Sequence, residues 1–171
     1  MQETLLALGA LMIIMLIAVN QQRSTIHIHE QVYVREISQA RDDFAVRLLE
    51  GISNEMSFDE KTMALTDIPT NISSLSDILG PDPGETADST FDDIDDFEAY
   101  RDTFMHVISA DTFFFDVTFN VSYIDDDNTT TTSKTFAKEI SALIAPLQDF
   151  GKYGNTLTGV FSKTKVIYED F

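Results

Sequence analysis

The chain has 171 residues, a formal net charge of −18 at pH 7 and no cysteine. So negative a charge argues against binding to nucleic acid or to an anionic membrane surface, because both attract proteins rich in lysine and arginine. The lack of cysteine excludes a disulfide framework, a thiol nucleophile and a thiolate metal site.

The first stretch of the chain is almost wholly apolar. Fifteen apolar residues run from Leu5 to Val19, after a single early charge at Glu3. As a helix they span about 22 Å, somewhat less than the roughly 30 Å hydrocarbon core of a bilayer. A helix that is apolar on every side must be buried, either in lipid or among copies of itself. A cleavable signal peptide fits less well, because neither a basic start nor a small-residue cleavage site is present.

The helix is expected to continue beyond the apolar stretch. Residues 20–25 contain neither proline nor glycine, and an apolar stripe with spacings of seven and four follows them. The stripe consists of Ile26, Tyr33, Ile37, Phe44, Leu48 and Ile52. We therefore predict one helix over residues 1–54, about 80 Å long, with an apolar first part at 1–24 and an amphipathic second part.

An acidic connecting region is expected at residues 58–102. It contains three prolines, and no positive residue lies between Lys61 and Arg101. In its densest part Phe91, Ile94 and Phe97 recur at every third position among aspartates. We expect these apolar residues to dock on a sheet while the neighbouring carboxylates face water.

Strands are expected in the last third of the chain. Residues 112–124 alternate between apolar and polar side chains, which is typical of a half-buried strand. Turn formers at 125–128 and threonines at 129–132 indicate a hairpin. Residues 134–144 fit either a helix or one strand face, and we favour the strand because an isolated hairpin is only marginally stable. A last strand is expected at 155–168.

The predicted fold class is therefore α+β. A long N-terminal helix packs on a small antiparallel sheet of about three strands, which forms one globular domain over residues 55–171.

This arrangement resembles the type IV pilin family, pseudopilins included. The resemblance covers the first 54 residues: an apolar helix interrupted by one early glutamate, then an amphipathic half, then a small β domain. The family places that glutamate fifth in the mature chain, whereas Glu3 is third here. The resemblance implies a single-pass protein of the inner membrane, handled by prepilin-processing and pilus assembly machinery. It further implies assembly of identical subunits into an extracellular filament on the cell surface.

The resemblance also implies roles for individual residues. Glu3 would pair with the α-amino group of Met1, on its own chain or on a neighbouring copy, and so fix the register between subunits. The helices would pack in parallel to form the filament core. The core residues are Leu5, Leu6, Leu8, Leu11, Ile13, Ile14, Leu16 and Ile17.

Few residues suggest chemistry. No Ser-His-Asp order and no glycine-rich phosphate loop is present, so we expect neither an enzyme nor a cofactor. Two aspartate clusters offer oxygen ligands for calcium, but without a glycine-centred loop of ligand spacing we favour solvated acidic loops. The calcium candidates are Asp92, Asp93, Asp95, Asp96, Asp125 and Asp127. Asn-X-Ser/Thr motifs make Asn71, Asn120 and Asn128 possible glycan acceptors.

A second class of function stays open on the sequence alone. The apolar helix also suits a signal anchor that tethers a binding domain outside the cytoplasm. A minor pseudopilin of a secretion system is a further alternative. The sequence distinguishes neither a major from a minor subunit nor adhesion from motility, DNA uptake or secretion.

Overall fold

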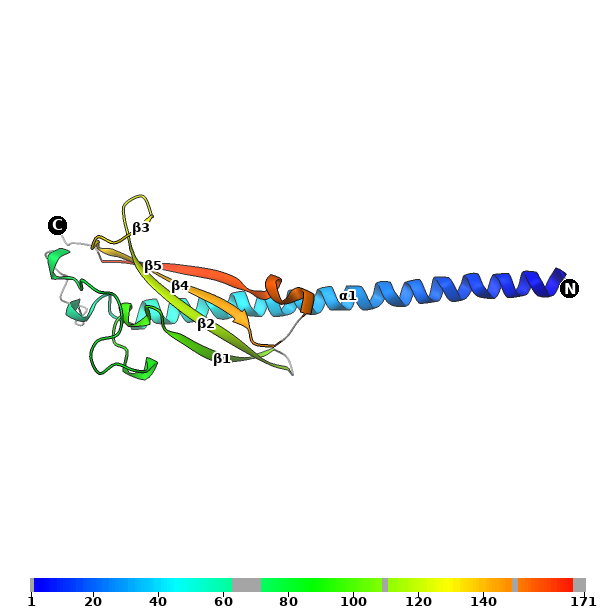
Figure 1. Ribbon diagram of the computed structural model, residues 1–171, viewed down its shortest axis with the longest axis horizontal. Coiled ribbons are helices and arrows are strands. Elements are labelled where there is room, and N and C mark those ends of the chain that lie inside the picture. The colour runs from blue at the N-terminus through cyan, green and yellow to red at the C-terminus, as the bar shows by residue number, and fades with distance from the viewer. Residues whose placement is uncertain (1, 63–71, 109–110, 149–150, 168–171) are drawn as a thin grey trace. The chain divides into compact units, whose positions relative to one another are not determined.

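The computed structural model describes residues 2–62, 72–108, 111–148 and 151–167 (Figure 1). The chain forms two compact units, residues 1–39 and residues 40–171. The long helix α1, Gln2–Glu55, contributes to both units. A helix at the N-terminus of an α+β chain is thus confirmed, and we describe each unit separately.

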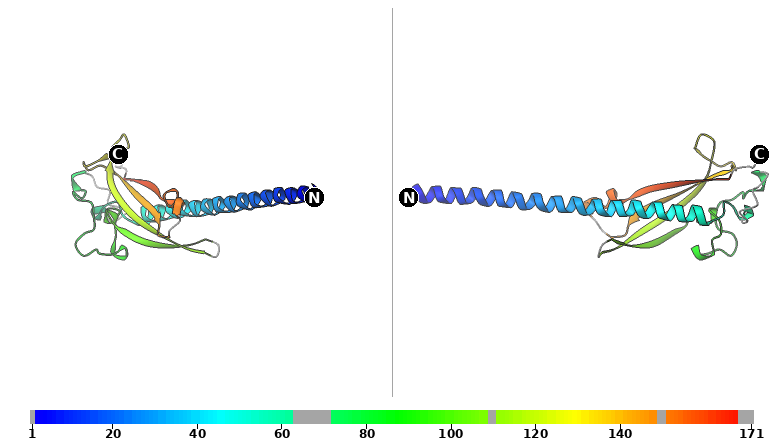
Figure 2. Two further views of the ribbon diagram at one scale, coloured as in Figure 1. Left: turned by 45° about the vertical axis from the view of Figure 1, so that its right-hand side comes forward. Right: turned by 180° about the vertical axis from the view of Figure 1, so that it is seen from behind.

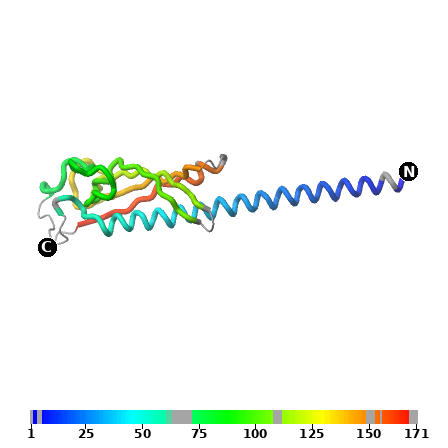
Figure 3. Tube along the Cα trace, turned by 90° about the horizontal axis from the view of Figure 1, so that it is seen from below, coloured from blue at the N-terminus to red at the C-terminus, as the bar shows by residue number. Residues whose placement is uncertain are grey.

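Over its described residues, 2–39, the first unit consists of helix alone (Figure 3). Unbranched and branched aliphatic residues fill its start, without a proline to interrupt the backbone hydrogen bonds. Glu3 lies in the first turn, where a negative charge faces the positive end of the helix dipole.

The second unit contains an antiparallel sheet with the strand order β1-β2-β4-β5 (Figures 1 and 2). The long strands are β1 (Arg101–Ile108), β2 (Asp111–Ile124), β4 (Ala137–Pro146) and β5 (Gly159–Val166). A short strand β3, Thr130–Thr131, pairs with β2 beside the hairpin. The described sheet therefore has five strands rather than about three. The strand β1 was not predicted, because apolar and polar residues are mixed on both of its faces.

The core lies between one face of the sheet and the last part of α1. The predicted alternation of β2 is confirmed, since the six apolar side chains at alternate positions from 113 to 123 are at most 4% exposed. Those side chains are Phe113, Phe115, Val117, Phe119, Val121 and Tyr123. From α1, Phe44 stacks on Phe115 with ring centroids 5.9 Å apart and also meets Phe104 at 5.7 Å. The amphipathic end of the helix is thus held by aromatic contacts with the sheet.

The two later strands differ from expectation at their ends. The segment at 134–144 is a strand, as favoured, but β4 starts only at Ala137 and continues to Pro146. The predicted strand at 155–168 is shorter, because residues 151–157 form a 3-10 helix in which Leu157 is fully buried. A Cβ added at Gly159, the first residue of β5, would lie 2.9 Å from the Phe161 ring and 3.2 Å from the Arg41 guanidinium, so a larger residue there would require these side chains to shift.

The acidic connecting region is folded around short 3-10 helices. These are η1 (Glu60–Thr62), η2 (Ile72–Ser74), η3 (Asp88–Thr90) and η4 (Asp95–Phe97). Phe91, Ile94 and Phe97 are buried, and the Phe97 ring lies 5.3 Å from that of Phe119 on β2. The expectation that the neighbouring carboxylates face water is wrong for Asp93, Asp95 and Asp96, each of which is 3% exposed.

Candidate functional site

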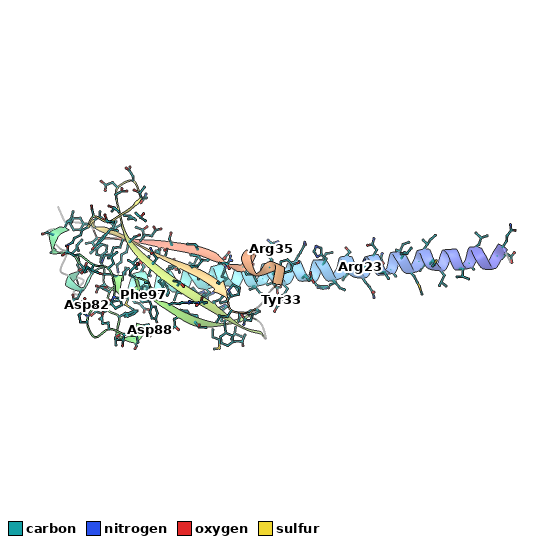
Figure 4. The ribbon with its side chains drawn as sticks, in the orientation of Figure 1. Arg23, Tyr33, Arg35, Asp82, Asp88 and Phe97 are labelled. Atoms are coloured by element: carbon teal, nitrogen blue, oxygen red, sulfur yellow. The ribbon has the colours of Figure 1, made fainter. Side chains whose placement is uncertain are left out.

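The apolar part of α1 is the most exposed hydrophobic surface of the first unit. Its large apolar side chains from Leu6 to Val19 are 46–74% exposed. In Figure 4 side chains project from both sides of the helix between Arg23 and the N-terminus. The exposed set is Leu6, Leu8, Leu11, Met12, Ile13, Ile14, Met15, Leu16, Ile17 and Val19. We call this set the apolar segment.

Exposure of the apolar segment to water is costly. Burying one large aliphatic side chain is worth roughly 1.5–3 kcal/mol, and the segment has ten of them on all sides of a helix. Among the described residues, α1 is the one helix that is long and apolar enough to cross a membrane. Glu3 is exposed, whereas Met1 and the side chain of Leu5 lie outside what the structure describes. The segment therefore needs a partner, either lipid or protein.

A buried group of charged side chains lies in the second unit. The Nζ of Lys138, on β4, is 2.6 Å from Asp95 Oδ1 and 3.3 Å from Asp59 Oδ2. It also donates a hydrogen bond to the carbonyl oxygen of Phe58 at 2.7 Å. Lys138 and Asp59 are fully buried, and Asp95 and Asp93 are each 3% exposed. We call Lys138, Asp59, Asp95 and Asp93 the buried charged cluster.

Three distant segments bring this cluster together. Strand alternation turns Lys138 to the same inner face of β4 as Ile140 and Ala142. The turn after α1 supplies Asp59, whose Oδ2 also accepts the backbone N–H of Ser76 at 2.8 Å. Helix η4 supplies Asp95.

Two aromatic rings lie beside the charged groups. The rings of Phe58 and Tyr123 lie 4.7 Å and 5.3 Å from the Lys138 Nζ and cover the site with apolar surface.

Asp93 is protonated at neutral pH in this environment. Burial, the shared hydrogen bond with Asp95 and the charges of Asp95 and Asp96 together raise its pKa from 3.8 to about 9, although Lys138 acts in the opposite direction. Burial likewise raises the pKa of Asp95, against the attraction of Lys138. Asp93 Oδ1 accepts the backbone N–H groups of Asp95 and Asp96 at 2.9 Å and 3.3 Å, which fixes the start of η4.

Lysines of the sheet region supply positive charge to the connecting region, which has none between Lys61 and Arg101. Besides Lys138, Lys134 contacts Asp77 at 2.6 Å and donates to the carbonyl oxygen of Leu75 at 2.6 Å. Lys165, on β5, donates to the carbonyl oxygens of Ser53 and Met56 at the end of α1, whose last turn has no basic residue. A cation there satisfies carbonyls that the helix leaves free and complements its dipole. Three lysines, Lys134, Lys138 and Lys165, therefore bind carboxylates and carbonyl oxygens of the acidic chain.

We expect the stability of the second unit to increase on acidification from about pH 8 to pH 5. In that range folded Asp93 keeps a proton that the unfolded chain, with an aspartate pKa near 3.8, has released. The folded state thus binds more protons, and one such group changes the free energy of unfolding by up to about 1.4 kcal/mol per pH unit. This contribution is complete below pH 3.8 and is lost as the pH rises towards 9. Urea unfolding followed by circular dichroism at several pH values measures the slope.

The matched variants for this prediction are Asp93→Asn and Asp126→Asn. An asparagine at position 93 keeps an oxygen for the two backbone N–H groups but cannot ionise, so the pH slope should become smaller. Asp126 is exposed in the β2–β3 turn, and its replacement should leave the slope unchanged. An unchanged slope in Asp93→Asn would show that another group is responsible.

The six calcium candidates are distributed over three different environments. Asp93 and Asp95 belong to the buried charged cluster. Asp92 and Asp96 place carboxylate oxygens within 4.8 Å of one another and of Glu85, while Asp96 Oδ2 already accepts the backbone N–H groups of Asp92 and Asp93. Asp125 binds the N–H groups of Asp127 and Thr129, and so organises a turn. We assign no metal to these residues, because each carboxylate that accepts these bonds has a structural role within its own segment.

The three glycosylation candidates lie apart from these clusters. Asn120 is exposed on the outer face of β2, and Asn128 is exposed in the following turn with a φ of 57°. Asn71 falls outside the described residues. Both described asparagines are therefore accessible, and glycosylation of any of the three stays a prediction.

Comparison with known proteins yields no match to a protein-family model, a curated protein or a solved structure. The two features of the structure that bear on function are therefore the apolar segment of the first unit and the buried charged cluster of the second. The first feature was predicted from the sequence. The roles of Lys138 and Asp59 were not predicted. The lysine at an inward position of the expected strand was the one signal that could have indicated a buried charge.

Proposed function

We propose that this protein is a structural subunit of a type IV pilus-like extracellular filament and is held in a membrane by α1 before assembly. The observation that carries the proposal is the exposure of the apolar segment on all sides of the helix. One small domain cannot cover a helix that is apolar all round, but lipid or a bundle of identical helices can. Parallel packing of the helices from many copies would bury the segment completely.

The distribution of charge supports this proposal. Only five of the charged residues lie in the first 39 positions, and Glu3 is the only ionisable side chain among the first 22. The net charge of −18 therefore falls almost entirely on the second unit. Copies packed through their helices would keep the mutually repelling acidic domains apart on the outside, where water and salt screen them.

Glu3 is the residue with the clearest role in this assembly. A carboxylate carried into an apolar bundle costs several kcal/mol unless a cation pairs with it. We expect the α-amino group of Met1 on a neighbouring copy to be that cation, so that each added subunit is fixed in register. Glu3→Ala should therefore leave the fold and membrane insertion intact but slow or abolish assembly.

Counting filaments on cells by electron microscopy measures this effect. Glu36→Ala is the matched control, because it removes an exposed carboxylate from the same helix beyond the apolar segment. Equal numbers and lengths of filaments in wild type and Glu3→Ala would contradict the register role.

The proposed function itself is tested by isolating surface appendages and identifying their main protein by mass spectrometry. We expect filaments in which this chain is the dominant component. If the chain instead stays a monomer in the membrane fraction and no filament contains it, the membrane-tethered binding domain becomes the better proposal.

A further inference from the structure

We propose that Lys138 and Asp95 are joined by an intramolecular amide bond, formed in the folded protein between the Nζ of the lysine and the side-chain carboxyl carbon of the aspartate. The proposal rests on the geometry of the buried charged cluster and is independent of the filament proposal. Nζ lies 2.6 Å from Asp95 Oδ1, and both side chains are removed from water. The lysine nitrogen, a nucleophile, and the aspartate carboxyl group thus stay in contact for as long as the protein is folded.

The site can supply a neutral amine without an external base. The three polar contacts of Lys138, with Asp95, Asp59 and the carbonyl oxygen of Phe58, satisfy an ammonium group. Transfer of one proton along the 2.6 Å contact gives a neutral amine and a neutral carboxylic acid. Lys138 is fully buried and Asp95 is 3% exposed, so bulk water does not reach the reacting atoms. The remaining two N–H groups still donate to Asp59 and Phe58, and the nitrogen lone pair faces Asp95.

The neighbouring carboxyl groups are placed to complete the reaction. The Nζ lone pair forms a bond to the carboxyl carbon of Asp95, and the carbon–oxygen π electrons move to the oxygen. Asp59, 3.3 Å from Nζ, accepts a proton from the nitrogen. Asp93, whose Oδ1 accepts the backbone N–H of Asp95 at 2.9 Å, donates the proton of its carboxyl group to the departing hydroxyl group. The carbonyl re-forms and one water leaves. Asp59 and Asp93 together hold one proton before and after the reaction.

Burial distinguishes this pair from another lysine–aspartate pair of the same chain. Lys134 Nζ also lies 2.6 Å from a carboxylate, that of Asp77, but the Asp77 side chain is 85% exposed. Water solvates the Asp77 carboxylate there, so no condensation is expected. The amide would fasten η4 of the connecting region to β4, across 43 positions of sequence.

Mass spectrometry of the full chain, purified in detergent, tests the proposal. We expect the intact mass to be lower than the mass of the unlinked chain by one water molecule. Trypsin should release residues 62–101 joined to residues 135–152, since an acylated Lys138 is no longer a cleavage site. Lys134→Arg should keep both results, whereas Lys138→Arg should abolish them.

Asp93→Asn keeps the test informative if Lys138→Arg does not fold. It preserves an acceptor for the backbone of η4 but removes the acid, so the folded variant should show the unlinked mass. Folded wild-type protein with the unlinked mass and no joined peptide would overturn the proposal and leave the cluster as an ion pair. A joined peptide that persists in full yield in Asp93→Asn would overturn the role of Asp93 as the acid.

Discussion

Replacing Lys138 by methionine is expected to lower the free energy of unfolding of the second unit by at least about 3 kcal/mol. The change removes the Nζ that contacts both Asp59 and Asp95, whether as the ammonium group of an ion pair or as the nitrogen of the proposed amide, and leaves both carboxyl groups buried without it. It also removes the hydrogen bond to the carbonyl oxygen of Phe58, which then lacks a donor in an apolar setting. Methionine fills a similar volume, so loss of packing contributes little. Urea unfolding of the full chain in detergent, followed by circular dichroism, measures the loss.

Lys134→Met is the matched control for this experiment. Lys134 has a carboxylate partner at the same 2.6 Å and a carbonyl acceptor, but Asp77 is largely exposed. A surface ion pair and one hydrogen bond are together worth about 1 kcal/mol. If both variants lose the same free energy of unfolding, burial does not determine how much the Lys138 contacts contribute to stability.

Removal of the apolar segment is expected to have the second large effect. A fragment that starts at Arg23 should be a soluble monomer in buffer without detergent, whereas the full chain should need detergent or form filaments. The deletion removes the ten exposed side chains of the apolar segment and leaves residues 40–171, a compact unit, unchanged. Size-exclusion chromatography with light scattering gives the mass of each species in solution.

A fragment that starts at Leu11 serves as the control for the deletion. It retains Leu11 to Val19, which includes eight residues of the apolar segment, and should still require detergent. Filaments formed by the Arg23 fragment in water would contradict the prediction, because they would place the assembly contacts in the acidic domain.

The elements that sequence analysis predicted are those encoded by local periodicity. The apolar segment and the seven-and-four stripe predict a helix, because in a helix residues four and seven positions apart lie on the same face. The alternation in β2 specifies a half-buried strand for the same reason, and the inward set from Phe113 to Tyr123 is confirmed. The strand β1 was missed because both of its faces mix polar and apolar residues, so no period of two distinguishes it. The exposed apolar helix, and with it the basis of the proposed function, was therefore available from the sequence.

The buried charged cluster was decided by tertiary structure alone. Lys138 meets Asp95 across 43 positions and Asp59 across 79, and no local pattern relates residues so far apart. The rule that carboxylates face water predicted a solvated acidic region, and it failed because β4 places one lysine where three aspartates converge. An aspartate is buried only when a partner compensates for its lost hydration. Whether such a partner is present depends on which strand lies opposite, and that is fixed by the fold of the whole domain.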